Sequence, residues 1–251
     1  MAIAASRVFH VNVNCASLER SLAFYRDTLG FVPGARTTPA APQPGGPFGL
    51  DRVQWDAFMM TGSDGMLAPV VDLLEWKVPG PVGQPPATAV APGFSALHVT
   101  TPGAGGTSTV RDPDGTLVAV TEGSGVAVTG VTLGCSDADR TLRFLVDVLG
   151  FSGTGTHATD RAGTFEVELV ELGARSVGDE PPPAANRLGI FRVALMTDDL
   201  VHDYGVLRDA RVRCYSPPAR LDMGPGLPEL TALFFADPDG ATFELIETPR
   251  A

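Results

Sequence analysis

Short runs of apolar residues, several of them alternating with polar ones, recur along the chain and predict strands rather than long helices. The first run, residues 8–14, places Val11 on one face and His10 on the other. Further strands are expected at 53–60, 70–76, 94–100, 117–120, 131–133, 165–172, 191–196, 230–235 and 242–246.

Helical spacing of apolar residues interrupts this pattern three times. Leucines recur at this spacing over 18–29 and again over 142–149, and a glycine that can adopt a left-handed conformation follows each stretch, at Gly30 and Gly150. A third helix is expected from about 199 to 207. The residues expected to begin the helices are Ser17, then Ser136 or Asp137, then Asp198 and Asp199.

The chain contains a repeat. Residues 18–31 and 138–151 are identical at seven of fourteen positions in register, and the turn Asp-Pro-Asp-Gly occurs at 112–115 and again at 237–240. The order strand, helix, strand, strand, strand recurs in each half. We therefore expect two tandem domains, residues 1–122 and 126–251, joined at the small residues 123–125.

Composition limits the possible partners. With 44% hydrophobic and 19% charged residues among 251, the chain can form a packed core, and its net charge of −11 argues against nucleic acid and anionic membrane surfaces. No apolar run reaches the length of a spanning helix, and the first residues do not resemble a signal peptide. Three widely spaced cysteines favour reduced thiols, so a cytoplasmic location is expected.

The first strand, a helix ending in Phe-Tyr-x-x-x-Leu-Gly-Phe and the Asp-Pro-Asp-Gly hairpin together resemble the glyoxalase, bleomycin-resistance and extradiol-dioxygenase superfamily, also called vicinal oxygen chelate. The likeness covers about residues 7–122 and 126–249. It implies an α+β fold of paired βαβββ modules whose curved mixed sheets enclose a cavity. In active members, side chains from the first and last strands of each module hold a divalent metal there.

In the N-terminal half, the resemblance places His10, Asp72 and His98 at metal-ligand positions, whereas the fourth position is Ala119 instead of a glutamate. Two imidazoles and a carboxylate suit Fe, Mn, Ni, Co or Zn. The second module is short, because His98 and Ala119 are 21 residues apart while Arg192 and Glu244, at the equivalent positions of the other half, are 52 apart. A helix is therefore expected to be missing from the second module.

In the C-terminal half, the four corresponding positions are Gly130, Glu168, Arg192 and Glu244. Glycine offers no ligand, and arginine is a permanent cation that repels a metal. Two interpretations remain open for Glu168, Arg192 and Glu244. They form either a structural ion-paired cluster or an acid–base pair beside an arginine that holds an oxyanion without a metal.

Other conspicuous residues have simpler interpretations. His157 and His202 are expected at the surface. Trp55, Phe58, Met59, Met60 and Trp76 lie on strands, where one face is expected to form core while the other either forms core or lines a cavity for a flat apolar ligand. The loops expected at 39–49, 79–93 and 216–228 either cover such a cavity or are plain connections.

Three functions fit these observations. The first is an isomerase, lyase or cyclase that removes a proton next to a carbonyl group of a carbonyl- or enol-rich, aromatic or polyketide-like small molecule, with the enolate held by a metal or by arginine. The second is an Fe(II) extradiol-type dioxygenase, and the third a non-catalytic protein that binds a drug or metabolite. Whether the chain acts as a monomer or a homodimer stays open.

Overall fold

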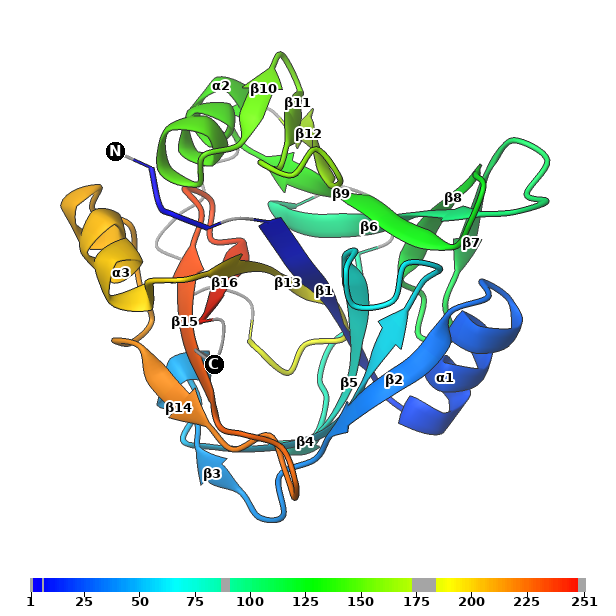
Figure 1. Ribbon diagram of the computed structural model, residues 1–251, viewed down its shortest axis with the longest axis horizontal. Helices are drawn as coiled ribbons and strands as arrows, with labels where there is room; N and C mark the ends of the chain where they lie inside the picture. The colour runs from blue at the N-terminus through cyan, green and yellow to red at the C-terminus, as the bar shows by residue number, and fades with distance from the viewer. Residues whose placement is uncertain (1, 6, 87–90, 173–183, 248–251) are drawn as a thin grey trace.

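A computed structural model describes residues 2–5, 7–86, 91–172 and 184–247, which form two curled mixed sheets with few helices (Figure 1). The predicted α+β fold built from βαβββ modules is confirmed. The elements of the first half are β1 (Arg7–Cys15), α1 (Leu18–Asp27), β2 (Val32–Thr37), β3 (Gln43–Pro44), the 3-10 turn η1 (Gly46–Phe48), β4 (Arg52–Thr61), β5 (Val70–Val78), β6 (Gly93–Thr101), β7 (Thr107–Arg111) and β8 (Leu117–Glu122).

The second half repeats this order with more helix. Its elements are β9 (Ala127–Cys135), α2 (Ala138–Arg143), the π-helical turn η2 (Phe144–Val148), β10 (Ser152–Thr154), β11 (His157–Thr159), β12 (Glu166–Glu171), β13 (Gly189–Thr197), α3 (Leu200–Asp209), β14 (Ala219–Leu221), β15 (Leu230–Ala236) and β16 (Thr242–Glu247).

Each sheet combines strands from both halves of the chain. The nine-stranded sheet has the order β14-β15-β16-β13-β1-β5-β4-β2, with β3 added beside β4, and the seven-stranded sheet has the order β10-β11-β12-β9-β6-β8-β7. The halves join through the antiparallel pairs β1·β13 and β6·β9. The first and fourth modules therefore share one sheet, and the second and third share the other.

The helices begin where the sequence predicts. Ser17, Asp137 and Asp199 each accept a hydrogen bond from the backbone N–H three residues ahead. Gly30 and Gly150 have φ of +80° and +76°, conformations that glycine adopts without steric cost. As expected, the described part of the second module contains no helix, and the short strand β7 occupies the interval between β6 and β8.

The two Asp-Pro-Asp-Gly turns fasten neighbouring modules together. Asp239 accepts hydrogen bonds from Ser136 N (2.8 Å) and Ser136 Oγ (2.7 Å), directly before α2. Asp114, its counterpart, accepts from Ala16 N at 2.9 Å, directly before α1. The repeated turn thus joins the two sheets, once in each half of the chain.

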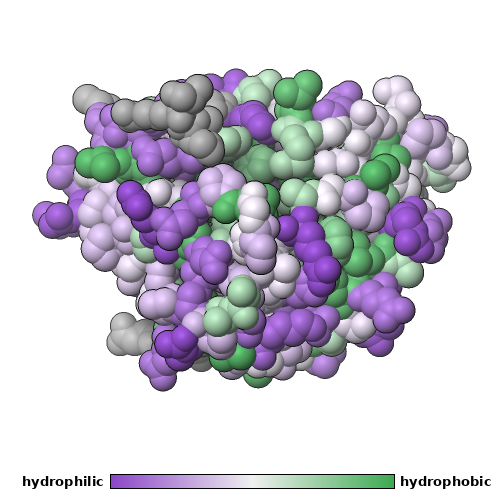
Figure 2. Space-filling view, turned by 60° about the horizontal axis from the view of Figure 1, so that its bottom comes forward, coloured by the Kyte–Doolittle hydropathy of each residue, from purple (hydrophilic) through white to green (hydrophobic). Residues whose placement is uncertain are grey.

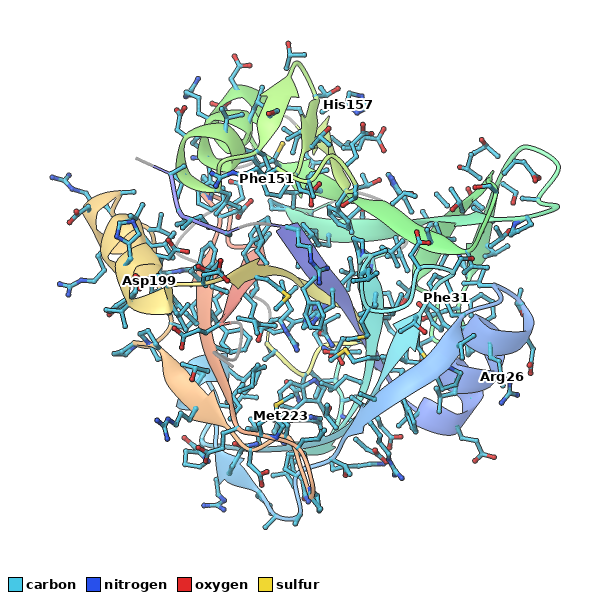
Figure 3. All side chains as sticks on the ribbon, viewed as in Figure 1. Arg26, Phe31, Phe151, His157, Asp199 and Met223 are labelled. Atoms are coloured by element: carbon cyan, nitrogen blue, oxygen red, sulfur yellow. The ribbon has the colours of Figure 1, made fainter. Side chains whose placement is uncertain are left out.

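Two apolar cores lie on opposite faces of the first sheet, because successive residues of a strand point to opposite sides. On β5, Leu73 packs into a large core that also includes residues of the second sheet and of the helices. Leu74 and Trp76 pack instead into a smaller core inside the ring of strands in the lower half of Figure 1. Figure 3 shows side chains projecting into this ring.

The predicted loops close the first sheet into this ring. Gln43 exchanges two 2.9 Å hydrogen bonds with the backbone of Asp222, and Thr38 N donates to Met223 O, so the two ends of the sheet meet. Val82 exchanges backbone hydrogen bonds with Asn186 and Leu188 on another side. Together these contacts enclose the smaller core.

The outer surface is mixed. Polar and hydrophobic residues are interspersed on the face shown in Figure 2. No described helix has the length and apolar character needed to cross a bilayer. Among the residues that the structure describes, the exposed large hydrophobic side chains are Val32, Met66, Leu67, Val82, Val201 and Leu227.

Candidate functional site

Four polar side chains from four adjacent strands meet on the inner face of the first sheet. They are Glu244 on β16, Arg192 on β13, His10 on β1 and Asp72 on β5. The strand order places these strands side by side, and the alternation of side chains points all four residues to the same face. Two residues predicted in one half of the chain thus join two predicted in the other.

Arg192 lies between the two carboxylates. Its Nε donates to Glu244 Oε2 at 2.7 Å, and its Nη2 donates to Asp72 Oδ2 at 2.9 Å. His10 Nε2 lies 3.2 Å from the same Glu244 oxygen, without the geometry of a hydrogen bond, and 3.9 Å from Asp72 Oδ2, which is beyond hydrogen-bonding distance. Asn12 Nδ2 donates to Asp72 Oδ2 at 3.1 Å.

The group is removed from solvent, which strengthens its electrostatic interactions. Arg192, the most exposed of the four side chains, retains 7% of its accessible surface. Burial alone would raise the pKa of Glu244, but the guanidinium of Arg192 and the nearby His10 outweigh it and hold that pKa below its ordinary value. With His10 neutral, the four side chains carry a net charge of −1.

Several polar atoms of this group have no hydrogen-bond partner, although buried polar atoms in proteins are nearly always paired. Arg192 Nη1 is a donor without an acceptor, and Asp72 Oδ1 and Asn12 Oδ1 are acceptors without a donor. Both ring nitrogens of His10 are also unpaired. The arrangement is therefore suited to a small molecule that carries both an acceptor and a donor.

Aromatic rings lie beside the guanidinium of Arg192. The guanidinium carbon lies 5.6 Å from the ring centre of Phe234 and 5.8 Å from that of Phe191. The ring of Phe234 packs on Phe48, which in turn contacts Trp55 and Trp76. Both tryptophans therefore belong to the core, and so does Met60, whereas Phe58 is partly buried against the larger core.

Asn12 is not among the predicted site residues, yet its side chain links β1 to Asp72. Asn14, two residues further along β1 on the same face, has a similar role. It accepts a hydrogen bond from Trp76 Nε1 at 3.0 Å and donates to two backbone oxygens at 2.7 Å. The signal for both was the run of polar residues at alternate positions of a strand that is otherwise apolar.

His98 does not join His10 and Asp72. It lies on β6 in the other sheet, because the second module pairs with the third rather than with the first. Glu168, on β12, is likewise separated from Arg192 and Glu244. His98 Nε2 lies 2.7 Å from Thr132 Oγ1, which donates to Glu168 Oε2 at 3.1 Å.

This second polar group is more open than the first. The His98 and Glu168 side chains retain 22% and 43% of their accessible surface, and His98 Nε2 lies 3.7 Å from Glu168 Oε2. Partial burial lowers the pKa of His98 despite the opposing charge of Glu168. Ala119 and Gly130, at the two remaining predicted positions of this sheet, contribute no ligand.

The two remaining histidines lie at the surface, as expected. His157, labelled in Figure 3, is exposed on β11 and lies 3.1 Å from Glu166, and His202 is exposed on α3.

The first group does not fit a divalent metal. His10, Asp72 and Glu244 have the right chemistry, but the guanidinium of Arg192 already binds the carboxylate oxygens that a metal would need. Bringing a second cation beside a buried, permanently charged arginine is strongly unfavourable. Among the described residues, no set of three or more His, Cys, Asp or Glu side chains is arranged to bind a metal ion.

The fold and this buried group define a class of protein: a chain of duplicated βαβββ modules with a polar group on the inner face of a closed sheet. A model of the Glyoxalase/Bleomycin resistance protein/Dioxygenase superfamily matches residues 128–245. The resemblance recognised in the sequence is therefore confirmed over the C-terminal half of the chain.

Solved structures share the fold over nearly the whole chain. Glyoxalase I from Zea mays has 16% sequence identity and a TM-score of 0.64, with 96% of this chain and 92% of that chain covered. A candidate dioxygenase from Bacillus subtilis subsp. subtilis str. 168 has 14% identity and a TM-score of 0.66, with 100% and 87% covered. A search of curated proteins finds no match. At these identities the structures show the fold alone.

Proposed function

We propose that the protein is an isomerase, lyase or cyclase that transfers a proton next to a carbonyl group of a small neutral molecule. The observation that carries the proposal is that Arg192 Nη1 and both ring nitrogens of His10 are buried without hydrogen-bond partners, in side chains that approach the same Glu244 oxygen. A donor fixed near a potential base is what proton removal next to a carbonyl requires, because the negative charge that develops on oxygen must be stabilised.

Arg192 would hold the oxygen of the substrate. Its orientation is fixed before any ligand arrives, since Nε and Nη2 are bound to Glu244 and Asp72 and aromatic rings lie beside the guanidinium. Nη1 therefore needs no reorganisation to donate to a carbonyl that becomes an enolate. Low solvent exposure increases the strength of that hydrogen bond.

His10 would accept the proton. A neutral imidazole nitrogen can accept a proton, and the Glu244 carboxylate 3.2 Å away would stabilise the imidazolium that forms. Asp72 Oδ1 and Asn12 Oδ1 are free to accept from a substrate hydroxyl or enol. The net charge of −1 disfavours carboxylates and phosphates as substrates, so the geometry supports a neutral hydroxycarbonyl compound.

Hydrogen–deuterium exchange tests this function directly. Hydroxyacetone, dihydroxyacetone and phenacyl alcohol would be incubated with the protein in D₂O, and loss of the proton next to the carbonyl followed by NMR. We expect exchange above the buffer rate for at least one of them, and a decrease of about 10²–10⁴-fold in His10→Gln. His157→Gln, which changes an exposed histidine outside the group, is the matched control.

Binding is measured separately by the fluorescence of Trp55 and Trp76, the only tryptophans of the chain, both in the smaller core that also contains Phe234. Saturable binding without exchange of any proton would replace the proposal with a non-catalytic binding protein. Exchange that persists in His10→Gln would remove His10 from the mechanism.

A further inference from the structure

The residue positions along the two sheets follow one plan. Across β16, β13, β1 and β5 the residues are Glu244, Arg192, His10 and Asp72, and the corresponding set across β12, β9, β6 and β8 is Glu168, Gly130, His98 and Ala119. The first set has carboxylates on the two outer strands and histidine and arginine on the central pair. Three of its four members are side chains that ligate metals.

Arg192 has the contacts of a bound cation rather than those of a ligand. It bridges the outer carboxylates, with donor–acceptor distances of 2.7 Å to Glu244 and 2.9 Å to Asp72. His10 Nε2 approaches the same Glu244 and Asp72 oxygens that the guanidinium contacts. One positive charge thus lies where the histidine and both carboxylates converge.

The charge balance supports the same interpretation. Two buried carboxylates that contact the same side chain are unstable without a counter-ion. The guanidinium is a permanent counter-ion, since arginine does not deprotonate in proteins. A divalent ion in addition would have to displace Nε and Nη2 and leave the guanidinium buried without partners. The three ligand-type residues are therefore available to a metal only when Arg192 is absent.

We propose that the guanidinium of Arg192 takes the place of a metal cation in this protein, and that its charge and its hydrogen bonds keep His10, Asp72 and Glu244 from binding one. The inference concerns cation binding and does not depend on the proposed reaction. It implies that replacement of Arg192 by an uncharged ligand creates a metal centre, whereas replacement by another cation does not.

Cobalt(II) is a suitable probe, because its visible absorption reports ligand number and geometry as it binds. Wild-type protein, Arg192→His and Arg192→Lys would be stripped with a chelator, dialysed and titrated with CoCl₂, with bound metal measured by elemental analysis. We expect one equivalent in Arg192→His, bound about 100-fold more tightly than any cobalt on the wild type. Arg192→Lys, which keeps a positive charge, should resemble the wild type.

Two double variants locate the metal. Adding His10→Ala to Arg192→His should abolish cobalt binding, whereas adding His98→Ala, on the other sheet, should leave it unchanged. Stoichiometric cobalt on the wild type that is lost in His10→Ala would overturn the proposal. So would a folded Arg192→His variant that binds no cobalt.

If Arg192→His is unfolded when stripped, refolding with CoCl₂ or MgCl₂ distinguishes the possibilities. Recovery with cobalt alone supports the proposal, since Mg²⁺ prefers oxygen ligands. If neither ion restores the fold, the wild type and Arg192→Lys provide the test. Absence of tight cobalt binding in both proteins supports the proposal, and tight binding in either one contradicts it.

Discussion

Replacing Arg192 by methionine removes the guanidinium that Asp72 and Glu244 share while keeping much of the side-chain volume. Both carboxylates then remain buried without the partner that now neutralises them. Removing one member of a buried ion pair typically costs about 3–5 kcal/mol. Contact of the methionine with the rings of Phe191 and Phe234 recovers part of the lost cation–π interaction, so we expect a loss of about 4 kcal/mol at pH 7.

The cost depends on pH in a direction that the structure fixes. In the wild type, the pKa of Glu244 is lowered, so its contribution is present above the unfolded pKa and is lost as the pH falls through the folded one. In Arg192→Met, burial without the guanidinium raises that pKa instead, and protonation relieves the unpaired charge. The destabilisation should therefore be largest near pH 7–8 and shrink as the pH falls toward about 4.

Thermal and urea unfolding at several pH values measures this difference. At about 2–4 °C per kcal/mol for a chain of this size, the expected decrease in Tm at pH 7 is roughly 8–16 °C. The matched control is Arg220→Met, whose ion pair with Glu229 is 3.4 Å long and exposed at both ends. It should cost less than about 1 kcal/mol at any pH.

Two results would refute this reasoning. One is an Arg192→Met variant as stable at pH 7 as Arg220→Met, which would mean that the buried carboxylates do not need the guanidinium. The other is a destabilisation that does not change between pH 7 and pH 5, which would assign the loss to packing instead of charge.

Further predictions concern the turns and the smaller core. Asp239→Ala removes the acceptor of both Ser136 hydrogen bonds before α2 and should cost about 2–3 kcal/mol by urea unfolding. Asp27→Ala, which breaks a fully exposed ion pair, is the control and should leave the urea midpoint unchanged. Burial raises the pKa of Asp237 to about 7, so the protonated carboxyl favours folding and the free energy of unfolding falls as the pH rises from about 4 to 7. Asp237→Asn should remove this pH dependence. An unchanged pH dependence in the variant would show that another group causes it. Phe48→Ala leaves a cavity beside both tryptophans and should cost about 3–5 kcal/mol of unfolding free energy. The tryptophan fluorescence should shift to the red, and an unshifted spectrum would mean that Phe48 does not keep solvent from the tryptophans.

The buried helices and strands can be predicted from the sequence because burial of one face makes apolar residues recur at regular intervals. Strands such as β5 and β13 are buried along nearly their whole length, and the helices begin at capping residues. By contrast, β2 is exposed except at Thr37 and contains a proline and a glycine, while β10 is exposed throughout. Short exposed strands carry little hydrophobic pattern, so β2, β3, β7, β10, β11 and β14 were not expected.

It is harder to predict from the sequence which residues come together in one site. The sequence and its resemblance identify His10, Asp72, Arg192 and Glu244 as four separate candidates, but they do not determine which module pairs with which. That choice depends on the contact between β1 and β13, which are far apart in the chain. Consequently His98 and Glu168 were grouped with residues that lie on the other sheet.

Exposure accounts for the different residues that the two sheets carry at matching positions. In the first sheet, the hydrogen bonds of Gln43 and Val82 close the ring and exclude solvent from the polar group. Its charges must therefore be balanced by neighbouring side chains, and loss of Arg192 alone would leave two buried carboxylates without a counter-ion. In the second sheet, Glu168 is partly exposed, and solvent stabilises its charge. Gly130 and Ala119 can therefore occupy ligand positions there without leaving a buried charge unpaired, whereas the enclosed group can change only if its net charge is preserved.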